Sequence, residues 1–65
     1  EMTLQVFNLQ GQLVRTLIAG RQPAGRSHAV WNGLDQRGEL VASGIYFIML
    51  KTPEQNFTRK LVFAR

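Results

Sequence analysis

The sequence contains no cysteine and only one histidine among its 65 residues. The absence of cysteine excludes a disulfide framework and a thiolate metal site, and one imidazole cannot build a zinc site based on histidines. We expect His28 to be an ordinary strand residue. No apolar run approaches the ~18 residues of a membrane-spanning helix, so we predict no membrane insertion. A chain of this length buries only about 60% of its surface on folding, so close apolar packing has to supply its stability.

Acidic residues are also scarce, and the four carboxylates are dispersed among turns and chain ends. They are Glu1, Asp35, Glu39 and Glu54. A glycosidase-type pair has to hold two carboxyl groups about 5 to 10 Å apart, and a calcium site needs more oxygen ligands than Asp35 and Glu39 provide. We therefore expect no enzymatic activity, no metal and no cofactor. The simpler role for Asp35 is to cap its own turn.

A stretch over residues 20–27 has only a superficial likeness to a phosphate-binding loop. Arg26 stands where that loop has lysine, Pro23 removes one amide donor, and no helix is expected to follow. A phosphate site is therefore not predicted there.

Lysine and arginine outnumber the acidic residues by eight to four. These basic residues are spread along the chain, and only Arg59 and Lys60 are adjacent. Such dispersal favours a solvated surface over a nucleic-acid site, which would interleave aromatic and basic side chains on an exposed sheet face. Residues 57–60 come nearest to that pattern, and we predict no nucleic-acid partner.

Five short segments have strand character and are separated by turn signals, which predicts an all-β fold of antiparallel strands. The predicted strands are residues 3–7, 13–18, 28–32, 45–50 and 57–63. The segment 45–50 is apolar on both faces, so it should be a central strand that is covered on both sides. Residues 19–27 should form a loop, and residues 39–43 an irregular segment or a short strand. The whole pattern favours a small immunoglobulin-like β-sandwich, with residues 1–65 in one domain.

Two turns share one pattern, an Asx residue followed three positions later by glycine. Asn8 and Gly11 bound the first turn, and Asp35 and Gly38 bound the second. The pattern is typical of a type I turn whose glycine takes the left-handed conformation. A third turn over residues 52–56 contains Pro53, which presets the backbone angle φ of the second turn position.

The only tryptophan and the only tyrosine lie in residues 29–47, which we interpret as the centre of the core. Trp31 could line a sugar-binding groove, but its place in a predicted strand favours a core position. Tyr46 could be a recognition residue or a corner tyrosine whose hydroxyl bonds to the backbone, and the corner role is favoured. With both residues in the core, phenylalanine alone would make a poor carbohydrate platform.

Several short motifs keep a specific order and spacing over nearly the whole chain. They lie at residues 6–17, 23–25, 30–35, 38, 43–47 and 59–62. In these motifs the chain resembles the C-terminal sorting domain of the type IX secretion system, which is itself similar to the immunoglobulin-like domain of the flagellar hook-capping protein. The resemblance implies a non-enzymatic tail of a larger exported protein that is secreted or held at the cell surface. Its partners would be the type IX translocon of the outer membrane, a sortase and the parent cargo domain.

The resemblance also assigns roles to individual residues. Those that the translocon would recognise are Gly44, Tyr46, Lys60 and Arg65. Those that would define the fold are Gly11, Gly25, Trp31, Gly33, Asp35 and Gly38. Asn32 stands where aspartate is common in the family, a difference that removes a charge without disturbing the turn.

Members of this family usually have one more strand upstream, so the resemblance implies that the fragment lacks its first strand. A sheet edge without that strand has unpaired amides, and we predict self-association through it or packing on the parent protein. The alternative to a sorting module is an immunoglobulin-like structural or assembly spacer, as in the flagellar hook cap.

Overall fold

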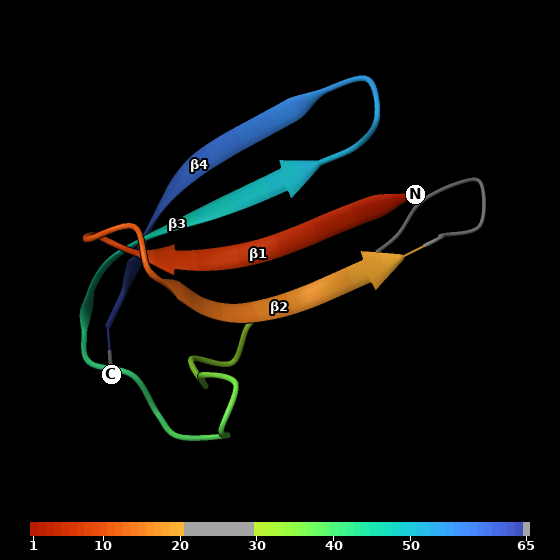
Figure 1. The fold of residues 1–65 in the computed structure, drawn as a ribbon. Coiled ribbons are helices and arrows are strands. Elements are labelled where there is room, and N and C mark those ends of the chain that lie inside the picture. Colours follow the sequence, from red (N-terminus) through yellow and green to blue (C-terminus); the bar gives the residue numbers. More distant parts are fainter. Residues whose placement is uncertain (21–29, 65) are drawn as a thin grey trace.

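The computed structural model of the protein describes residues 1–20 and 30–64 (Figure 1). Four strands make one antiparallel sheet: β1 (Met2–Asn8), β2 (Leu13–Gly20), β3 (Gly44–Lys51) and β4 (Asn56–Phe63). Their order across the sheet is β2-β1-β3-β4. Residues 1–20 and 30–64 contain no helix, which confirms the predicted all-β class and the antiparallel arrangement.

Two tight turns connect the paired strands as the sequence predicts. Between β1 and β2, Gly11 has a φ of 84° and its amide donates to the carbonyl of Asn8 at 3.0 Å. The Asn8 side chain reinforces this turn, because its Oδ1 accepts from the amide of Gln12 at 2.9 Å. Between β3 and β4, the amide of Thr52 donates to the carbonyl of Gln55 at 2.8 Å. The local Asx, glycine and proline signals therefore located both hairpins.

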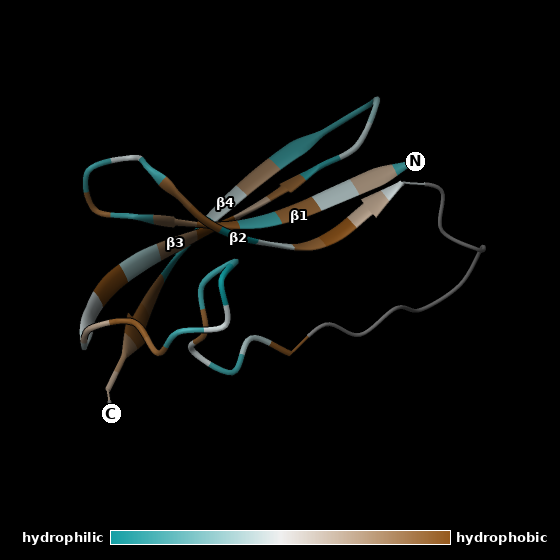
Figure 2. Ribbon diagram, turned by 60° about the horizontal axis from the view of Figure 1, so that its bottom comes forward, coloured by the Kyte–Doolittle hydropathy of each residue, from teal (hydrophilic) through white to brown (hydrophobic). Residues whose placement is uncertain are grey.

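The sheet has two faces that follow from the pairing register, because directly opposed residues of neighbouring strands share a face. The face that carries Tyr46 is called the Tyr46 face, and the other is called the Phe47 face. The Tyr46 face carries mainly apolar side chains, among them Leu4, Val6, Tyr46, Ile48, Leu50, Phe57, Leu61 and Phe63. Figure 2 shows bands of hydrophobic colour along β3 and at the end of β4.

Residues 30–43 lie on the Tyr46 face, at the end of the sheet where β1 finishes and β3 begins (Figure 1). They form a small irregular hairpin, closed by an isolated bridge between Leu34 and Leu40 and by the turn from Asp35 to Gly38. The expected turn is therefore confirmed, and residues 39–43 are irregular apart from the bridge at Leu40.

The prediction of a fifth strand over residues 28–32 is wrong for the part that the structure describes. Val30, Trp31 and Asn32 have no strand pairing, and Val30 is 85% exposed. Trp31 packs through its ring instead, so apolar character at this position reflects side-chain contacts and not a sheet ladder. His28 and most of the expected loop lie outside the described residues, and β2 continues through Ala19 to Gly20.

The core is small, and β3 is less covered than its sequence predicts. Only Val6, which is fully buried, and Tyr46, which is 7% exposed, count as buried hydrophobic residues in the described part of the chain. β3 is central in the sheet as expected, with β1 and β4 on its two sides. However, Ile45 is 39% exposed, because it points to the Phe47 face, away from residues 30–43. Coverage on both sides is therefore not found.

Within the described ranges there is no helix with the length and hydropathy that crossing a membrane would require.

Candidate functional site

Three aromatic rings meet where residues 30–43 contact the sheet. The ring centroid of Trp31 lies 5.1 Å from that of Tyr46 and 5.2 Å from that of Phe63. The Tyr46 and Phe63 rings are 6.5 Å apart and nearly perpendicular. Edge-to-face and tilted contacts at such distances are the favourable arrangement for aromatic pairs. Trp31 thus packs against the other two rings but is only partly buried, so the predicted core position is met only in part.

Both polar aromatic residues of this cluster direct their donors to the backbone. The hydroxyl of Tyr46 donates to the carbonyl of Ala42 at 2.7 Å, four residues upstream, as expected of a corner tyrosine. The indole Nε1 of Trp31 donates to the carbonyl of Leu34 at 2.9 Å. The Tyr46 bond ties the end of the irregular hairpin to β3, whereas the Trp31 bond closes the hairpin on itself. A side chain held in this way serves structure, and the burial of Tyr46 leaves little of it for a partner to read.

Gly33 lies against the ring of Phe63 and cannot carry a side chain without displacing it. Its φ is 80°, and a Cβ at this position would collide with Cζ of Phe63 and lie 2.7 Å from Cε1. The carbonyl of Gly33 also accepts from the amide of Val41 at 2.9 Å. The family resemblance implied a fold-defining role for Gly33 but did not identify Phe63 as its partner. The pattern contains no signal for that contact, which joins residues thirty positions apart.

Asp35 organises the turn from Asp35 to Gly38 in the irregular hairpin. Its Oδ1 accepts from the amides of Arg37 at 2.9 Å and Glu39 at 3.0 Å, which is the capping role predicted from the sequence. The bond from Glu39 is the largest cause that holds the pKa of Asp35 below its ordinary value of 3.8, and it acts with the Arg37 amide and guanidinium against a partial desolvation. With one oxygen occupied twice by turn amides, this carboxylate is committed to structure.

We expect the stability of the chain to fall in acid partly through Asp35. The pKa of Asp35 is lower in the folded chain than in the unfolded chain. Its ionised carboxylate therefore contributes its full stabilisation at pH values above the unfolded-state pKa, and this stabilisation is lost as the pH falls through the folded-state pKa. Asp35→Asn keeps an oxygen acceptor but loses the charge, so it should be less stable at neutral pH and lose less stability on acidification. Thermal unfolding between neutral and acidic pH measures this, with Glu54→Gln as the matched control. If Asp35→Asn and the parent sequence lost the same stability on acidification, Asp35 would not be a source of the acid sensitivity.

Two contacts to β2 anchor the turn at Asp35, and the sequence analysis did not identify them. A guanidinium nitrogen of Arg15 donates to the carbonyl of Asp35 at 2.7 Å. Gln36 bonds to the outer edge of β2, where its amide donates to the carbonyl of Val14 at 3.1 Å and its Oε1 accepts from the amide of Thr16 at 3.4 Å. Because these partners are about twenty positions apart, no local pattern could have indicated the pairing.

The residues proposed for recognition are brought only partly together. Gly44 and Tyr46 lie in β3 opposite Phe63 and Leu61 of β4. Lys60 lies in the same pair of strands but opposite Phe47, on the other face of the sheet, and is exposed. Arg65 and the fold-defining Gly25 lie outside the described residues.

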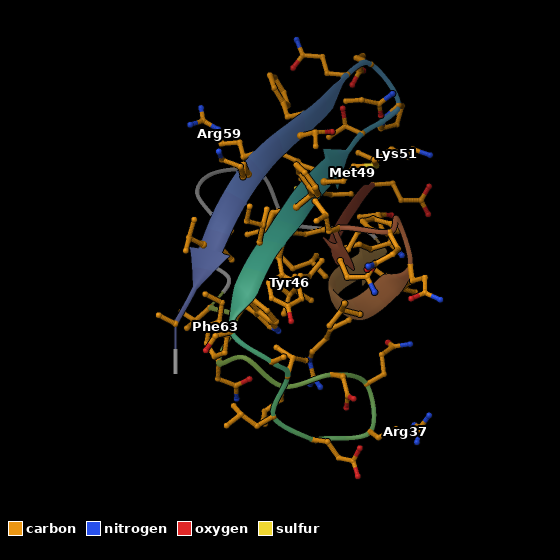
Figure 3. The ribbon with its side chains drawn as sticks, turned by 90° about the vertical axis from the view of Figure 1, so that its left-hand side faces the viewer. Arg37, Tyr46, Met49, Lys51, Arg59 and Phe63 are labelled. Atoms are coloured by element: carbon orange, nitrogen blue, oxygen red, sulfur yellow. The ribbon has the colours of Figure 1, made fainter. Side chains whose placement is uncertain are left out.

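The far end of the Tyr46 face presents an open apolar groove. Ile48, Leu50, Phe57 and Arg59 line it, and Phe57 is 49% exposed. Figure 3 shows Arg59 about midway along β4, farther from the loop that carries Arg37 than Tyr46 and Phe63 are. The aromatic cluster and the groove therefore occupy opposite ends of one face.

The arrangement offers several surfaces for contact with other molecules. Within residues 1–20 and 30–64 there is no cluster of histidine, aspartate or glutamate that could hold a metal ion. What remains is a sheet with one basic outer strand, an open apolar groove and a turn fixed by its own hydrogen bonds.

Comparison with protein families gives a match over most of the chain. The family model described as FlgD Ig-like domain matches residues 1–55, which include the described strands β1 to β3 and the aromatic residues Trp31 and Tyr46. No curated protein and no solved structure matches the chain. The match supports the immunoglobulin-like part of the resemblance seen in the sequence, and together with the antiparallel sheet it confirms the predicted fold class.

Proposed function

Because the chain belongs to the FlgD Ig-like domain family, we propose that it is a non-catalytic, immunoglobulin-like structural domain that helps a larger protein to assemble. The observation that carries this proposal is the apolar Tyr46 face, which extends beyond the cluster around Trp31 into the open groove at Ile48 and Leu50. An apolar face that its own domain leaves open is typical of a contact surface for neighbouring protein.

The commitment of polar groups supports the non-catalytic part of the proposal. Asp35 caps its turn, Tyr46 bonds to the backbone, and Arg15 holds the carbonyl of Asp35. A catalytic group would instead need a free reactive atom in a cleft beside a second titratable group.

The proposed role predicts that neighbouring segments of the parent protein stabilise this domain. We expect amides of β1 and β3 to exchange more slowly in the parent protein than in the isolated chain, because the groove at Leu50 would be covered. Hydrogen exchange of both proteins under identical conditions measures the difference. Equal protection would mean that the domain needs no neighbour, and the assembly role would lose its support.

A second candidate is the sorting module of the type IX secretion system, which the sequence resembles. The observation in its favour is the exposure of Lys60 together with Arg59 on the outermost strand. In this reading the domain directs an exported cargo across the outer membrane to the medium or the cell surface. The translocon would read the basic strand, and a sortase would process the tail. Tyr46 would then act through the fold, since it is buried.

One experiment separates the two functions. The chain, with its native upstream segment, is fused to a fluorescent reporter that carries a signal peptide, in a host with the type IX system. A sorting module delivers the reporter to the surface or the medium, and the variant with Lys60→Glu and Arg65→Glu fails to do so. A structural domain leaves a folded reporter in the periplasm with either sequence. Arg37→Glu, a charge reversal in the exposed turn, is the control.

A further inference from the structure

We propose that the free edge of β4 accepts an extended acidic segment of a partner protein as an additional strand of the sheet. This inference rests on the proposed assembly role, for which it names the docking surface and the chemistry of the partner. It concerns the outer edge of the sheet and the β4 side of the adjoining groove at Phe57, whereas the parent protein would cover the groove from the side of β3.

The two edges of the sheet differ in how far they are protected. β2 carries two register shifts against β1, at Leu4/Gln5 and Val6/Phe7, and Gln36 occupies its outer backbone groups at Val14 and Thr16. Bulges and a covering loop are the usual means by which proteins close an edge strand. The β2 edge is thus blocked over much of its first half.

β4 has none of these protections in the described residues. It pairs with β3 in unbroken register over all eight of its residues, from Asn56 to Phe63, and it lies at the end of the strand order. Residues 56–60 are all exposed. A long, regular edge strand presents a row of unpaired N–H and C=O groups, which is the template that strand addition requires. β4 is therefore the edge at which another strand can join.

Two adjacent cations determine the charge of the strand that fits. Arg59 lies opposite Ile48 and so belongs to the Tyr46 face, whereas Lys60 lies opposite Phe47 on the other face. Within the described residues neither cation takes part in an ion pair. A strand laid along β4 places consecutive side chains beside Arg59 and Lys60 on the two faces. Carboxylates at two adjacent positions would meet both cations.

The same charges argue against a second copy of the chain as the occupant. Two copies of β4 could pair antiparallel about a two-fold axis normal to the sheet. The Tyr46 faces of both copies would then lie on the same side, and each residue would oppose a residue of its own face. The registers with the greatest overlap then place Arg59 opposite Arg59, or Lys60 opposite Lys60. Like charges that are directly opposed across a strand pair are destabilising. The self-association predicted from the sequence is thus disfavoured at this edge, and an acidic partner is favoured.

The groove beside the edge adds a third requirement. Phe57 lies two positions before Arg59 on the same face and lines the groove with Leu50. A side chain of the added strand opposite Phe57 would be two positions from the carboxylate that meets Arg59, and it would lie against an apolar surface. The partner segment is thus an extended run with two adjacent acidic residues and an apolar residue two positions from one of them.

The test is a titration of the isotope-labelled chain with the blocked peptide Thr-Val-Thr-Val-Glu-Glu-Thr-Val-Thr, followed by NMR. We expect amide shifts confined to β4 and its neighbour β3, slower exchange of β4 amides, and weaker binding as salt is added. The double variant Arg59→Glu, Lys60→Glu should bind about tenfold more weakly, because it reverses both charges at the contact. Arg37→Glu, with its charge reversed in the distant turn, should bind as the parent sequence does.

Several outcomes would overturn the proposal. Equal binding of a peptide with Lys-Lys in place of Glu-Glu would remove the acidic requirement. Shifts centred on β2 or on Trp31 would place the contact elsewhere, and no binding at millimolar peptide would leave no docking edge. Sedimentation showing a dimer with β4 protected in the absence of peptide would make a second copy the occupant. These results leave the assembly role intact, since that role fails only if the parent protein does not protect β1 and β3.

Discussion

Gly33→Ala should destabilise the isolated chain by about 2–5 kcal/mol, whereas Gly38→Ala should cost only about 1–2 kcal/mol. Both glycines have positive φ, 80° for Gly33 and 84° for Gly38, so alanine costs about 1–2 kcal/mol of backbone strain at either position. Only at Gly33 would the new Cβ collide with the Phe63 ring, and forcing a group into packed space costs about 1–3 kcal/mol more. Nothing lies within 4 Å of a Cβ at Gly38, so that variant isolates the backbone contribution.

A loss of this size matters because the folded domain has little stability to begin with. At about 0.05–0.15 kcal/mol per residue, a chain of this length is stable by roughly 3–10 kcal/mol. Urea unfolding followed by fluorescence measures both variants, since Trp31 is the only tryptophan and lies 5.2 Å from the ring of Phe63. Equal unfolding midpoints for Gly33→Ala and Gly38→Ala would show that the ring contact does not limit stability.

Tyr46→Ala should have an effect of similar size. Tyr46 is 7% exposed and packs on Trp31, and truncation of a buried aromatic residue costs about 3–5 kcal/mol. Phe57→Ala removes an aromatic ring from the same sheet face at a position that is 49% exposed, so it should cost only about 1 kcal/mol. The comparison separates burial in the cluster from the mere presence of a ring.

Tyr46→Phe measures the hydrogen bond alone. It keeps the ring but leaves the Ala42 carbonyl without its 2.7 Å donor, which should destabilise the chain by about 1–2 kcal/mol. The same urea unfolding experiment gives the value. If Tyr46→Phe unfolds at the same urea concentration as the parent sequence, the corner bond does not hold residues 30–43 onto the sheet.

Sequence reasoning identified two residues of the aromatic cluster but not how they pack together. Tyr46 and Trp31 were assigned to the core from their type and context, and both lie in the aromatic cluster. Residues 30–32, the described part of the expected strand, do not pair in the sheet. The Trp31 ring packs against Phe63 while the Trp31 backbone runs outside the sheet. Apolar side chains report burial, but they do not report whether that burial is achieved by a strand or by an irregular segment.

The candidate surfaces were predictable to different extents. The exposure of Arg59 and Lys60 follows from their charge, and the sequence identified them as the one adjacent basic pair. Their separation onto two faces follows from alternation along a strand once β4 is established. That β4 is an open edge and β2 a covered one did not follow, because strand order and the contact of Gln36 with Val14 depend on the whole fold.

The sequence by itself determined the all-β class, the three turns and the capping role of Asp35 in one of them. These features are local: turn preferences and strand alternation act over two to five neighbouring residues. Only the tertiary structure decided which residues meet across long separations, such as Gly33 with Phe63 and Arg15 with Asp35, and which edge of the sheet stays open. Those contacts depend on how the strands are ordered and how residues 30–43 cross one face, and neither is encoded in any single segment of the chain.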